Sequence, residues 1–339
     1  MCEGEGAYFG GILEHIGGAG IRSGDSATCI PPFSFSESLQ AKLRETTRRI
    51  AMALGVRGLV NVQYAIKGET VYVIEANPRA SRTVPFISKA TGVPLAKCAA
   101  RIMAGESTPR PGPPGGRREP RGGGARPSDE RQLDWFCMKE AVMPWGRFPG
   151  ADVILGPEMK STGEVMGIAK SYPEAYAKTQ LAIDYKLPDP SAGKVFISVC
   201  DRDKRHILSV ARILRYLGFD ICSTEGTARV LRGGNVTCEV VEKISGPHDG
   251  ERPNIGDLIA DGKIAVIINT PYGPGSRGDG YLLRTEAVRR GVTCVTAMSA
   301  ANTYVSAIEA VREDQQGHGS ANDMGMDVIA LQDLPQHTV

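Results

Sequence analysis

Two short alternating segments joined by a glycine constrain this chain of 339 residues more than any other feature. The stretch Gly58–Gly92 begins GLVNVQYAIKGETVYVIEANPRA, and the alternation of its apolar residues predicts two antiparallel strands joined by a tight turn. A three-residue turn centred on Glu69 would place Gln63 opposite Glu75, whereas a two-residue turn would put them on opposite faces. With the longer turn, oxygen atoms of Gln63, Glu75 and Asn77 converge.

Carboxylate and amide oxygens at these positions suit magnesium better than zinc. Arg79 follows at once, and its planar guanidinium can bind phosphate or carboxylate oxygens through two hydrogen bonds. An ordinary hairpin with a polar outer face has the same spacing. The residues alone therefore leave a metal and phosphate site and a plain hairpin both open.

Composition limits the class of protein. The net charge is only +2, and no apolar run approaches the ~20 residues that a membrane helix needs. The eight cysteines are scattered without a CxxC pair, which predicts free thiols in a reducing cytoplasm and not a disulfide framework or a zinc site. No secretory signal is expected, because the N-terminus has no basic segment followed by an apolar one.

A glycine-rich run precedes the hairpin. It reads GGILEHIGGAGIRSGDS over residues 10–26, and its glycines allow a ligand to approach the backbone closely. Loops use glycine routinely, so a phosphate site and an ordinary loop both explain it. A helix is predicted over 34–54, where Ser34 and Glu37 form a capping box, and another over 93–104 that ends at Gly105.

Residues 108–130 break this pattern with TPRPGPPGGRREPRGGGARPSD, which holds no large apolar side chain apart from prolines. Such a composition predicts disorder. Arginines among glycines suit RNA phosphates, but no aromatic residue is present to stack on bases, so a solvated insertion is favoured and nucleic acid is not an expected partner.

From residue 193 onwards, strands and helices alternate. Strands are predicted at 195–199, 219–222, 238–241 and 264–268, with helices at 206–217, 227–232 and 255–260 between them. This order predicts a parallel sheet with helices on both faces, in which ligands bind beyond the carboxyl ends of the strands. Lys204, the loop 223–227 and Asn269 fall there and would suit a phosphate, although polar loop ends explain them equally well.

Three stretches of the first half closely resemble the C-terminal ATP-grasp half of the carbamoyl-phosphate synthase large subunit: IEANPRASRTVPFISKATGVPLAK, the EHI…AG…SGDS run, and WFCMKEAVMPWGRFPGADVILGPEMKSTGEVMG. The resemblance implies ATP and Mg²⁺ or Mn²⁺ as cofactors. It implies that Gln63, Glu75 and Asn77 bind the divalent ions, that Gln63 and Glu75 also bind ATP, and that Arg79 is catalytic, near the phosphates. The adenosine part of ATP would contact Gly20, Ile21, Arg22 and Ser23, and Arg22 is a departure because the family usually has histidine there.

The second half resembles the methylglyoxal-synthase-like regulatory domain that ends the same subunit, through ISV…DK, STEGTA and INT. The resemblance implies an allosteric site whose residues hold the phosphate of a nucleotide effector: Lys204, Thr224, Thr227, Lys243 and Asn269. Pro271 departs from the family, since some members have a hydroxyl there.

The expected fold class is therefore α/β, with a partial ATP-grasp domain (α+β, antiparallel sheet) followed by a Rossmann-like parallel-sheet domain of the methylglyoxal-synthase-like type. The expected boundaries are 1–107 for the partial ATP-grasp domain, 108–130 for the insertion, 131–186 for the rest of the synthetase half, 187–192 for a linker, 193–312 for the regulatory domain and 313–339 for a loose tail.

The resemblance implies an ATP-dependent ligase that phosphorylates carbamate, derived from bicarbonate, to carbamoyl phosphate for pyrimidine and arginine biosynthesis. Its partners would be a glutamine amidotransferase small subunit, a nucleotide effector and the N-terminal part of the large subunit. The chain begins part-way through the family's second synthetase half, without its lid subdomain, so little turnover is expected from it alone. A non-catalytic nucleotide-responsive module or an inactive remnant is the alternative. A free methylglyoxal synthase is disfavoured, because the matching loop offers only Glu225 as a carboxylate.

Overall fold

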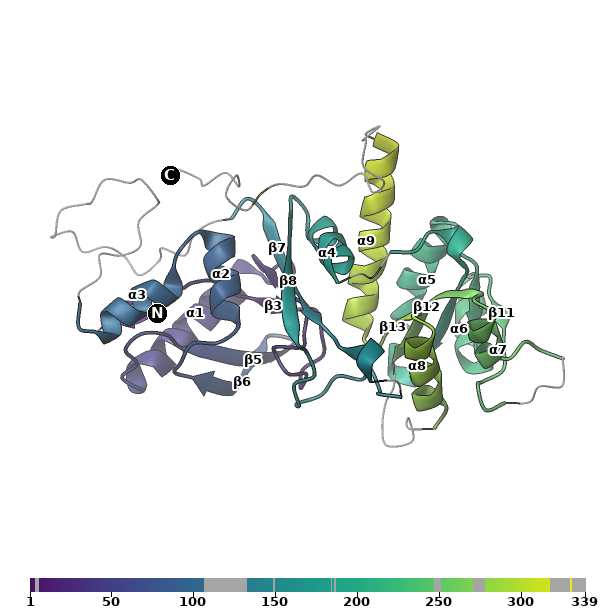
Figure 1. Ribbon diagram of the computed structural model, residues 1–339, viewed down its shortest axis with the longest axis horizontal. Coiled ribbons are helices and arrows are strands. Elements are labelled where there is room, and N and C mark those ends of the chain that lie inside the picture. The colour runs from purple at the N-terminus through teal and green to yellow at the C-terminus, as the bar shows by residue number, and fades with distance from the viewer. Residues whose placement is uncertain are drawn as a thin grey trace.

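The computed structural model describes residues 1–3, 6–106, 133–148, 150–183, 185, 187–246, 251–270, 278–317 and 330. The predicted insertion at 108–130, Pro271 and, apart from residue 330, the predicted tail beyond residue 317 lie outside these ranges. Figure 1 shows two sheet-containing parts lying end to end, with helices α4 (Tyr172–Ala182) and α9 (Met298–Gly317) side by side between them. Helix α9 continues past the predicted domain end at residue 312.

The first part is built on antiparallel strands. Its main sheet has the order β3-β4-β7-β8, and two separate pairs are formed by β1 with β2 and by β5 with β6. The strands are β1 (Cys2–Glu3), β2 (Gly6–Ala7), β3 (Glu14–His15), β4 (Thr28–Ile30), β5 (Asn61–Lys67), β6 (Thr70–Asn77), β7 (Phe136–Val142) and β8 (Gly163–Ala169). The helices, besides α4, are α1 (Glu37–Ala53), α2 (Thr83–Thr91), α3 (Leu95–Met103) and the 3₁₀ turn η1 (Trp145–Arg147).

The hairpin β5–β6 confirms one prediction and corrects another. Its turn has two residues, because Lys67 pairs with Thr70, so the predicted three-residue turn is wrong. A β-bulge follows, since Tyr64 pairs with Val73 while Gln63 pairs with Glu75, which leaves Ile74 as the extra residue. The bulge restores the predicted pairing of Gln63 with Glu75 that the shorter turn would have broken.

The start of α1 also differs from its prediction. Ser36 is the N-cap, and its side chain accepts a hydrogen bond from the backbone N–H of Leu39. Ser34 forms no capping box, because its backbone N–H and hydroxyl both donate to the carboxylate of Glu14. Glu14 is buried, so it needs these donors, and they keep Ser34 out of the helix. Helix α3 has Ala104 as its C-cap, one residue before the predicted Gly105, which follows with a φ of 84°.

The second part confirms the predicted parallel sheet, with the strand order β11-β10-β9-β12-β13. Its strands are β9 (Lys194–Val199), β10 (Ile221–Ser223), β11 (Glu239–Val240), β12 (Ile264–Thr270) and β13 (Thr293–Val295). Besides α9, its helices are α5 (Ile207–Tyr216), α6 (Glu225–Gly233), α7 (Ile255–Ala260) and α8 (Asp279–Arg289), with 3₁₀ turns η2 (Pro190–Ala192) and η3 (Asp201–Asp203).

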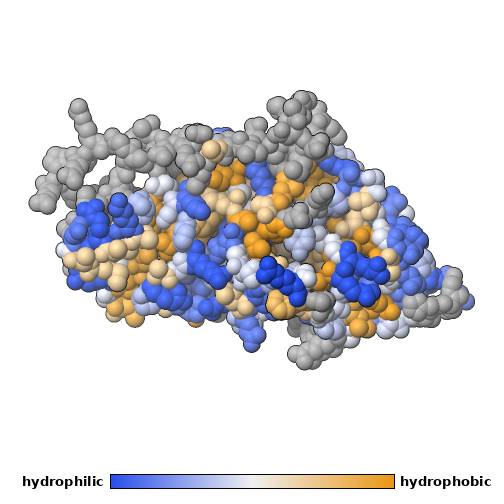
Figure 2. All heavy atoms as spheres, viewed as in Figure 1, coloured by the Kyte–Doolittle hydropathy of each residue, from blue (hydrophilic) through white to orange (hydrophobic). Residues whose placement is uncertain are grey.

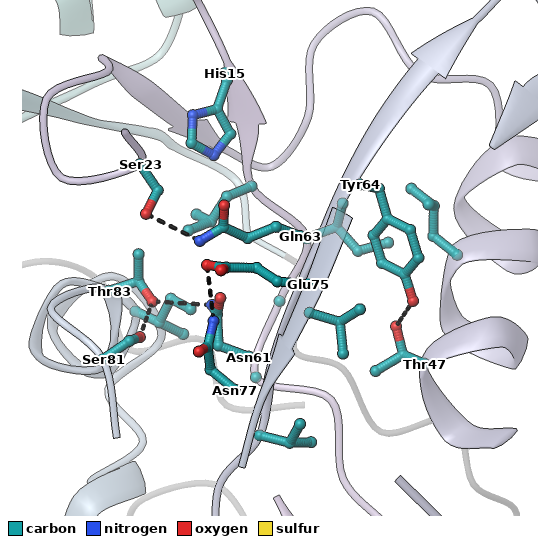
Figure 3. A pocket seen from close by; sticks show the side chains of 18 of the residues that line it. His15, Ser23, Thr47, Asn61, Gln63, Tyr64, Glu75, Asn77, Ser81 and Thr83 are labelled. Carbon is teal, nitrogen blue, oxygen red and sulfur yellow. Dashed lines mark hydrogen bonds between the residues drawn. The ribbon is translucent and has the colours of Figure 1, made fainter. Parts of the chain in front are cut away.

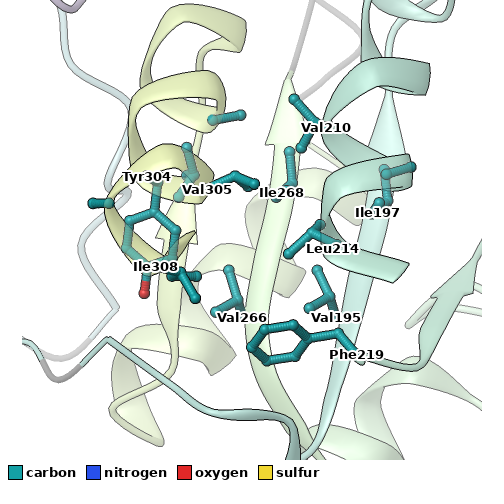
Figure 4. Packing of buried hydrophobic residues seen from close by; sticks show 14 of the residues in the cluster. Val195, Ile197, Val210, Leu214, Phe219, Val266, Ile268, Tyr304, Val305 and Ile308 are labelled. Carbon is teal, nitrogen blue, oxygen red and sulfur yellow. The ribbon is translucent and has the colours of Figure 1, made fainter. Parts of the chain in front are cut away.

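One buried cluster joins the two parts. Figure 4 shows side chains of β9 and β12, among them Ile197 and Ile268, packed between α5 and α9, which contributes Val305. The same cluster includes Met138 of β7 and Tyr176 of α4. Both sheets therefore share apolar contacts across α4 and α9, which favours a fixed arrangement of the two parts. On the face shown in Figure 2, hydrophilic residues are interspersed with hydrophobic ones over both parts.

Among the described helices, none combines the length and the hydrophobicity that crossing a bilayer requires.

Gly167 of β8 lies under α4, and an alanine there is expected to destabilise the fold. The added Cβ would collide with the backbone carbonyl oxygen of Ala175 and lie 3.0 Å from Thr179 Cγ2. Overpacking of this kind costs about 1–3 kcal/mol of unfolding free energy. Gly163→Ala, on the same strand, is the control, because its Cβ would meet only Val142 side-chain atoms at 3.8 Å. Urea midpoints that fall equally for the two variants would contradict this account.

Candidate functional site

A cavity of about 590 Å³ lies between the glycine-rich run, α1 and the β5–β6 hairpin. Its lining includes every residue predicted to bind ATP or metal or to act in catalysis: Gly20, Ile21, Arg22, Ser23, Gln63, Glu75, Asn77 and Arg79. The structure thus brings together residues from two separate stretches of sequence. Their roles in binding remain predictions.

The hairpin directs its polar side chains to one side. Figure 3 shows Gln63, Glu75 and Asn77 pointing to one side of the hairpin, where Ser23 and Thr83 lie, while Tyr64 points to the other side, toward Thr47 of α1. Asn77 Nδ2 donates to Glu75 Oε1 at 2.9 Å, and Gln63 Nε2 donates to Ser23 Oγ at 3.1 Å. The second of these bonds joins the hairpin to the glycine-rich run.

These residues form a donor set that fits a hard divalent cation. They comprise one carboxylate and two amides, and magnesium takes such oxygen ligands together with phosphate oxygens and water. No group of three or more His, Cys, Asp and Glu side chains suited to a metal occurs in the part of the chain that the structure describes, so a zinc-type site does not compete there. Arg79 is exposed beside the set, with Nη2 3.4 Å from Asn77 Oδ1.

Sequence reasoning missed several polar residues that line the same cavity. Asn61 lies opposite Asn77 in the hairpin, and its Nδ2 donates to Thr83 Oγ1 at 3.4 Å. The alternation of β5 places Asn61 on the face of Gln63, so a signal was present. Glu164 has a buried Oε1 without a hydrogen-bond partner among the described residues. It comes from β8, and its GPEMKSTGEVMG run could either face a nucleotide or merely end a strand, of which the sequence favours the second.

The glycine-rich run is held by a segment that follows η1. The buried carboxylate of Asp25 accepts hydrogen bonds from the backbone N–H groups of Lys160 at 2.7 Å and Ser161 at 3.0 Å. The N–H of Arg22 donates to Gly156 O at 2.8 Å. Lys139 Nζ lies 3.4 Å from the carbonyl oxygens of residues 23 and 24, and burial lowers the pKa of this lysine. The position of the run therefore depends on residues 156–161.

Glu140 of β7 is a buried carboxyl group close to this framework. Its Oε1 accepts from the backbone N–H of Ala141 at 2.9 Å, and its Oε2 accepts from Gln180 Nε2 at 3.2 Å. Burial raises the pKa of Glu140 from 4.5 to about 7, and these hydrogen bonds oppose the shift only in part. The folded protein therefore holds a proton at Glu140 over a pH range in which the unfolded chain has lost it.

This difference makes folding pH-dependent. The contribution of Glu140 to stability is fully present below pH 4.5 and is lost as the pH rises through about 7. Glu140→Gln is neutral at every pH, so we expect it to gain up to about 3 kcal/mol on the wild type between pH 5 and pH 8. Urea unfolding at both pH values measures the gain, and Glu45→Gln, on the exposed face of α1, is the control. A stability difference between Glu140→Gln and wild type that does not change with pH would contradict the buried-carboxyl account.

Four of the predicted effector residues, Lys204, Thr224, Thr227 and Asn269, lie around the carboxyl end of β9. Thr224 Oγ1 lies 3.2 Å from Ser198 Oγ, the N–H of Val199 donates to Thr227 Oγ1 at 3.3 Å, and Asn269 Nδ2 donates to Ser198 O at 2.9 Å. Lys204 Nζ pairs with Asp201 Oδ1 at 2.6 Å. The fifth, Lys243, has a side chain that is 65% exposed and whose Nζ lies 3.6 Å from Asp279 Oδ2. That these residues hold a phosphate remains a prediction.

Arg284 of α8 was not anticipated, and it contacts this group directly. Its Nη1 donates to Asn269 Oδ1 at 2.9 Å, and its Nε and Nη2 donate to the two carboxylate oxygens of Asp152. Burial favours a higher pKa for Asp152, but hydrogen bonds from Arg284 and Ile154 lower it overall. No pattern in the sequence connects these residues, which lie far apart in the chain.

Two family models match the chain in the order of its two parts. Residues 16–110 match the carbamoyl-phosphate synthase L chain, ATP binding domain, and residues 206–296 match the MGS-like domain. The chain is 44% identical over 98% of its length to the carbamoyl phosphate synthase large chain, C-terminal section, of Aquifex aeolicus, and 43% identical over 99% to the large chain of Pasteurella multocida. The chain belongs to the carbamoyl phosphate synthase large-chain family.

Within this family, the chain corresponds to a C-terminal portion. It spans 60% of the Aquifex protein and 29% of the Pasteurella large chain. The fold is α/β, with an ATP-grasp portion followed by an MGS-like domain, as predicted. A biotin carboxylase domain of a thermophilic 2-oxoglutarate carboxylase aligns over 53% of this chain and 44% of its own at 16% identity, with a TM-score of 0.36. At that score it adds nothing to the assignment to the synthase family.

Proposed function

We propose that this chain supplies part of the site at which carbamoyl phosphate synthase phosphorylates carbamate with ATP, together with a domain that binds a nucleotide effector. The observation that carries the proposal is the convergence of Gln63, Glu75, Asn77 and Arg79 with the glycine-rich run in one cavity. An acid, two amides and a base that face a run of glycines suit a triphosphate better than an apolar ligand.

Each group has a role in this proposal. When bound, Mg²⁺ or Mn²⁺ neutralises charge on the phosphate oxygens. Glu75 carries the negative charge that attracts the cation, and Gln63 and Asn77 add neutral oxygen ligands. Gln63 also holds Ser23, which places the backbone of Gly20 and Ile21, and the side chain of Arg22, along the cavity beside the adenosine. Arg79 binds the phosphate being transferred, so positioning and charge account for catalysis without a general base.

The site requires partners to work. Strand β6 pairs only with β5 among the described strands, and its residues Tyr72, Val73 and Ile74 are each at least 50% exposed. An edge strand with consecutive exposed apolar residues suits a covering protein surface. In this proposal the N-terminal part of the large chain covers it, a glutamine amidotransferase small subunit supplies ammonia, and the chain alone turns over little.

A regulatory module without catalysis is the second candidate. The gathering of Thr224, Thr227 and Asn269 at the carboxyl end of β9 favours it, because parallel sheets bind ligands at that edge. A methylglyoxal synthase remains disfavoured. Glu225, the carboxylate of the matching loop, is 54% exposed and pairs with Arg252 at 3.1 Å, which leaves it poorly placed as a catalytic base.

The decisive experiment measures carbamoyl phosphate formation from ATP, bicarbonate and ammonia by this chain, with and without a complementing N-terminal large-chain segment. Synthesis that depends on complementation supports the proposed ligase. Nucleotide binding without any synthesis supports the regulatory module, and methylglyoxal formed from dihydroxyacetone phosphate would revive the third candidate. The proposed ligase would act in the cytoplasm and supply pyrimidine and arginine biosynthesis.

A further inference from the structure

We propose that the Arg284–Asp152 pair is the connection through which an anion bound beside Asn269 changes the position of the glycine-rich run. Asp152 belongs to the segment between η1 and β8, whereas Arg284 and Asn269 belong to the second part of the chain. The inference rests on the proposed function, because it describes how a phosphorylated ligand of one part would regulate the ATP cavity of the other.

Arg284 is held rigidly at the junction of the two parts. Its side chain is 0% exposed, and it donates to Asp152 Oδ1 at 2.7 Å, Asp152 Oδ2 at 2.8 Å and Asn269 Oδ1 at 2.9 Å. A planar guanidinium that makes two bonds to one carboxylate fixes the orientation as well as the distance between its partners. A displacement of Asn269 therefore has to be accommodated by Arg284 and, through it, by Asp152.

At the ligand end, Asn269 is poised to respond to an anion. Its oxygen accepts from Arg284 and its nitrogen donates to Ser198 O, so both ends of the amide are engaged. A phosphate at the carboxyl end of β9 would draw the Asn269 N–H toward itself. The same negative charge would compete with Asp152 for the guanidinium of Arg284.

At the other end, a continuous series of hydrogen bonds leads from Asp152 to the ATP cavity. Lys160 Nζ donates to the carbonyl oxygens of Asp152 at 3.2 Å and Ile154 at 2.9 Å. The backbone N–H of Lys160 donates to Asp25, which lies at the end of the glycine-rich run. Ser23 of that run accepts from Gln63, one of the proposed metal ligands. Each step is a hydrogen bond, except that the chain itself links Asp25 to Ser23 two residues earlier.

The pair suits a switch better than a purely structural contact. A buried ion pair seldom adds net stability over apolar residues of similar volume, so the presence of one at a junction favours a role in specificity or switching. Coupling between two sites is reciprocal, which means that ATP-site ligands must alter effector affinity by the same factor as the reverse. To demonstrate such coupling, a segment between the two sites must be seen to change its conformation or dynamics when either the ATP cavity or the effector site is filled.

Hydrogen–deuterium exchange on the full chain tests this directly. The probes are uridine monophosphate, adenosine monophosphate and inorganic phosphate. We expect at least one probe to slow exchange by about 5-fold or more, both at its own site (198–204 and 224–227) and in the distant segments 19–26 and 152–161. At saturating probe, Arg284→Gln should keep protection at 198–204 and 224–227, which are held by the Ser198–Thr224 and Val199–Thr227 contacts and not by Arg284, and it should lose protection of the distant segments.

Arg289→Gln is the matched control, since Arg289 lies on the same helix but its side chain is 62% exposed and pairs with Glu286. Asp152→Asn provides a second test if Arg284→Gln does not fold, because the asparagine oxygen can still accept from Arg284 and so avoids the full cost of Asp152→Ala. Distant protection that persists in both pair variants would overturn the proposal, as would the absence of protection at the probe site with all three probes. The readout needs no catalysis, so failure of the complementation assay would leave this result interpretable and would count only against the proposed ligase.

Discussion

Glu75→Gln is expected to reduce carbamoyl phosphate synthesis by the complemented enzyme by at least about 10²-fold, because metal sites lose this much when a group that holds or orients the ion is removed. Glu75 is the single carboxylate among the three proposed metal ligands. The substitution preserves side-chain size and an oxygen that can accept from Asn77, so the fold should be retained. Initial rates at several Mg²⁺ concentrations measure the effect, and excess metal should recover part of the loss.

The control is Glu69→Gln in the turn of the same hairpin. Glu69 is exposed and does not line the cavity, so its neutralisation changes the net charge equally without touching the site. Its rate should stay within about 2-fold of wild type, since surface substitutions rarely have larger effects. Equal losses in both variants would show that general electrostatics, and not a metal ligand, explain the result.

The hairpin illustrates what period-two alternation can and cannot predict. Both strands were predicted from alternation, and the pairing of Gln63 with Glu75 is confirmed. The turn was wrong, because an alternating pattern carries no mark of the extra residue at a β-bulge. Tyr72, Val73 and Ile74 are each at least 50% exposed, and nothing in an apolar triplet indicates that all three side chains stay exposed.

Contacts between distant segments were beyond prediction for a different reason. The parallel sheet was predicted because alternation of strands and helices is a local signal. Ser34 failed as a cap because the distant carboxylate of Glu14 competes for its N–H, and local rules cannot include such a competitor. Arg284 looks like any charged residue of a helix, and only its partner 132 residues earlier in the chain shows that it is buried.

Removing Asp152 is expected to destabilise the protein more than removing Arg284, because Arg284 is the more deeply buried of the two charged side chains. Asp152→Ala leaves a guanidinium that is 0% exposed and whose one remaining acceptor among the described residues is the Asn269 oxygen. Breaking a buried pair in this way costs about 3–5 kcal/mol of unfolding free energy. In Arg284→Met the remaining carboxylate is 24% exposed and can be hydrated, so the loss should be nearer to about 1–2 kcal/mol.

The double variant Asp152→Ala/Arg284→Met separates this account from a simple loss of packing. Once the unpaired cation is gone, the double variant should be more stable than Asp152→Ala alone, which gives a coupling energy of about 1–3 kcal/mol in the mutant cycle. Arg289→Met is the control on the same helix and should change stability by less than about 0.5 kcal/mol. Strictly additive losses, measured by urea unfolding of all four proteins, would mean that the two charges do not stabilise each other. In that case Asn269 and apolar packing would hold the buried guanidinium in place. Ligand binding near α8 could then not affect the glycine-rich run through Asp152.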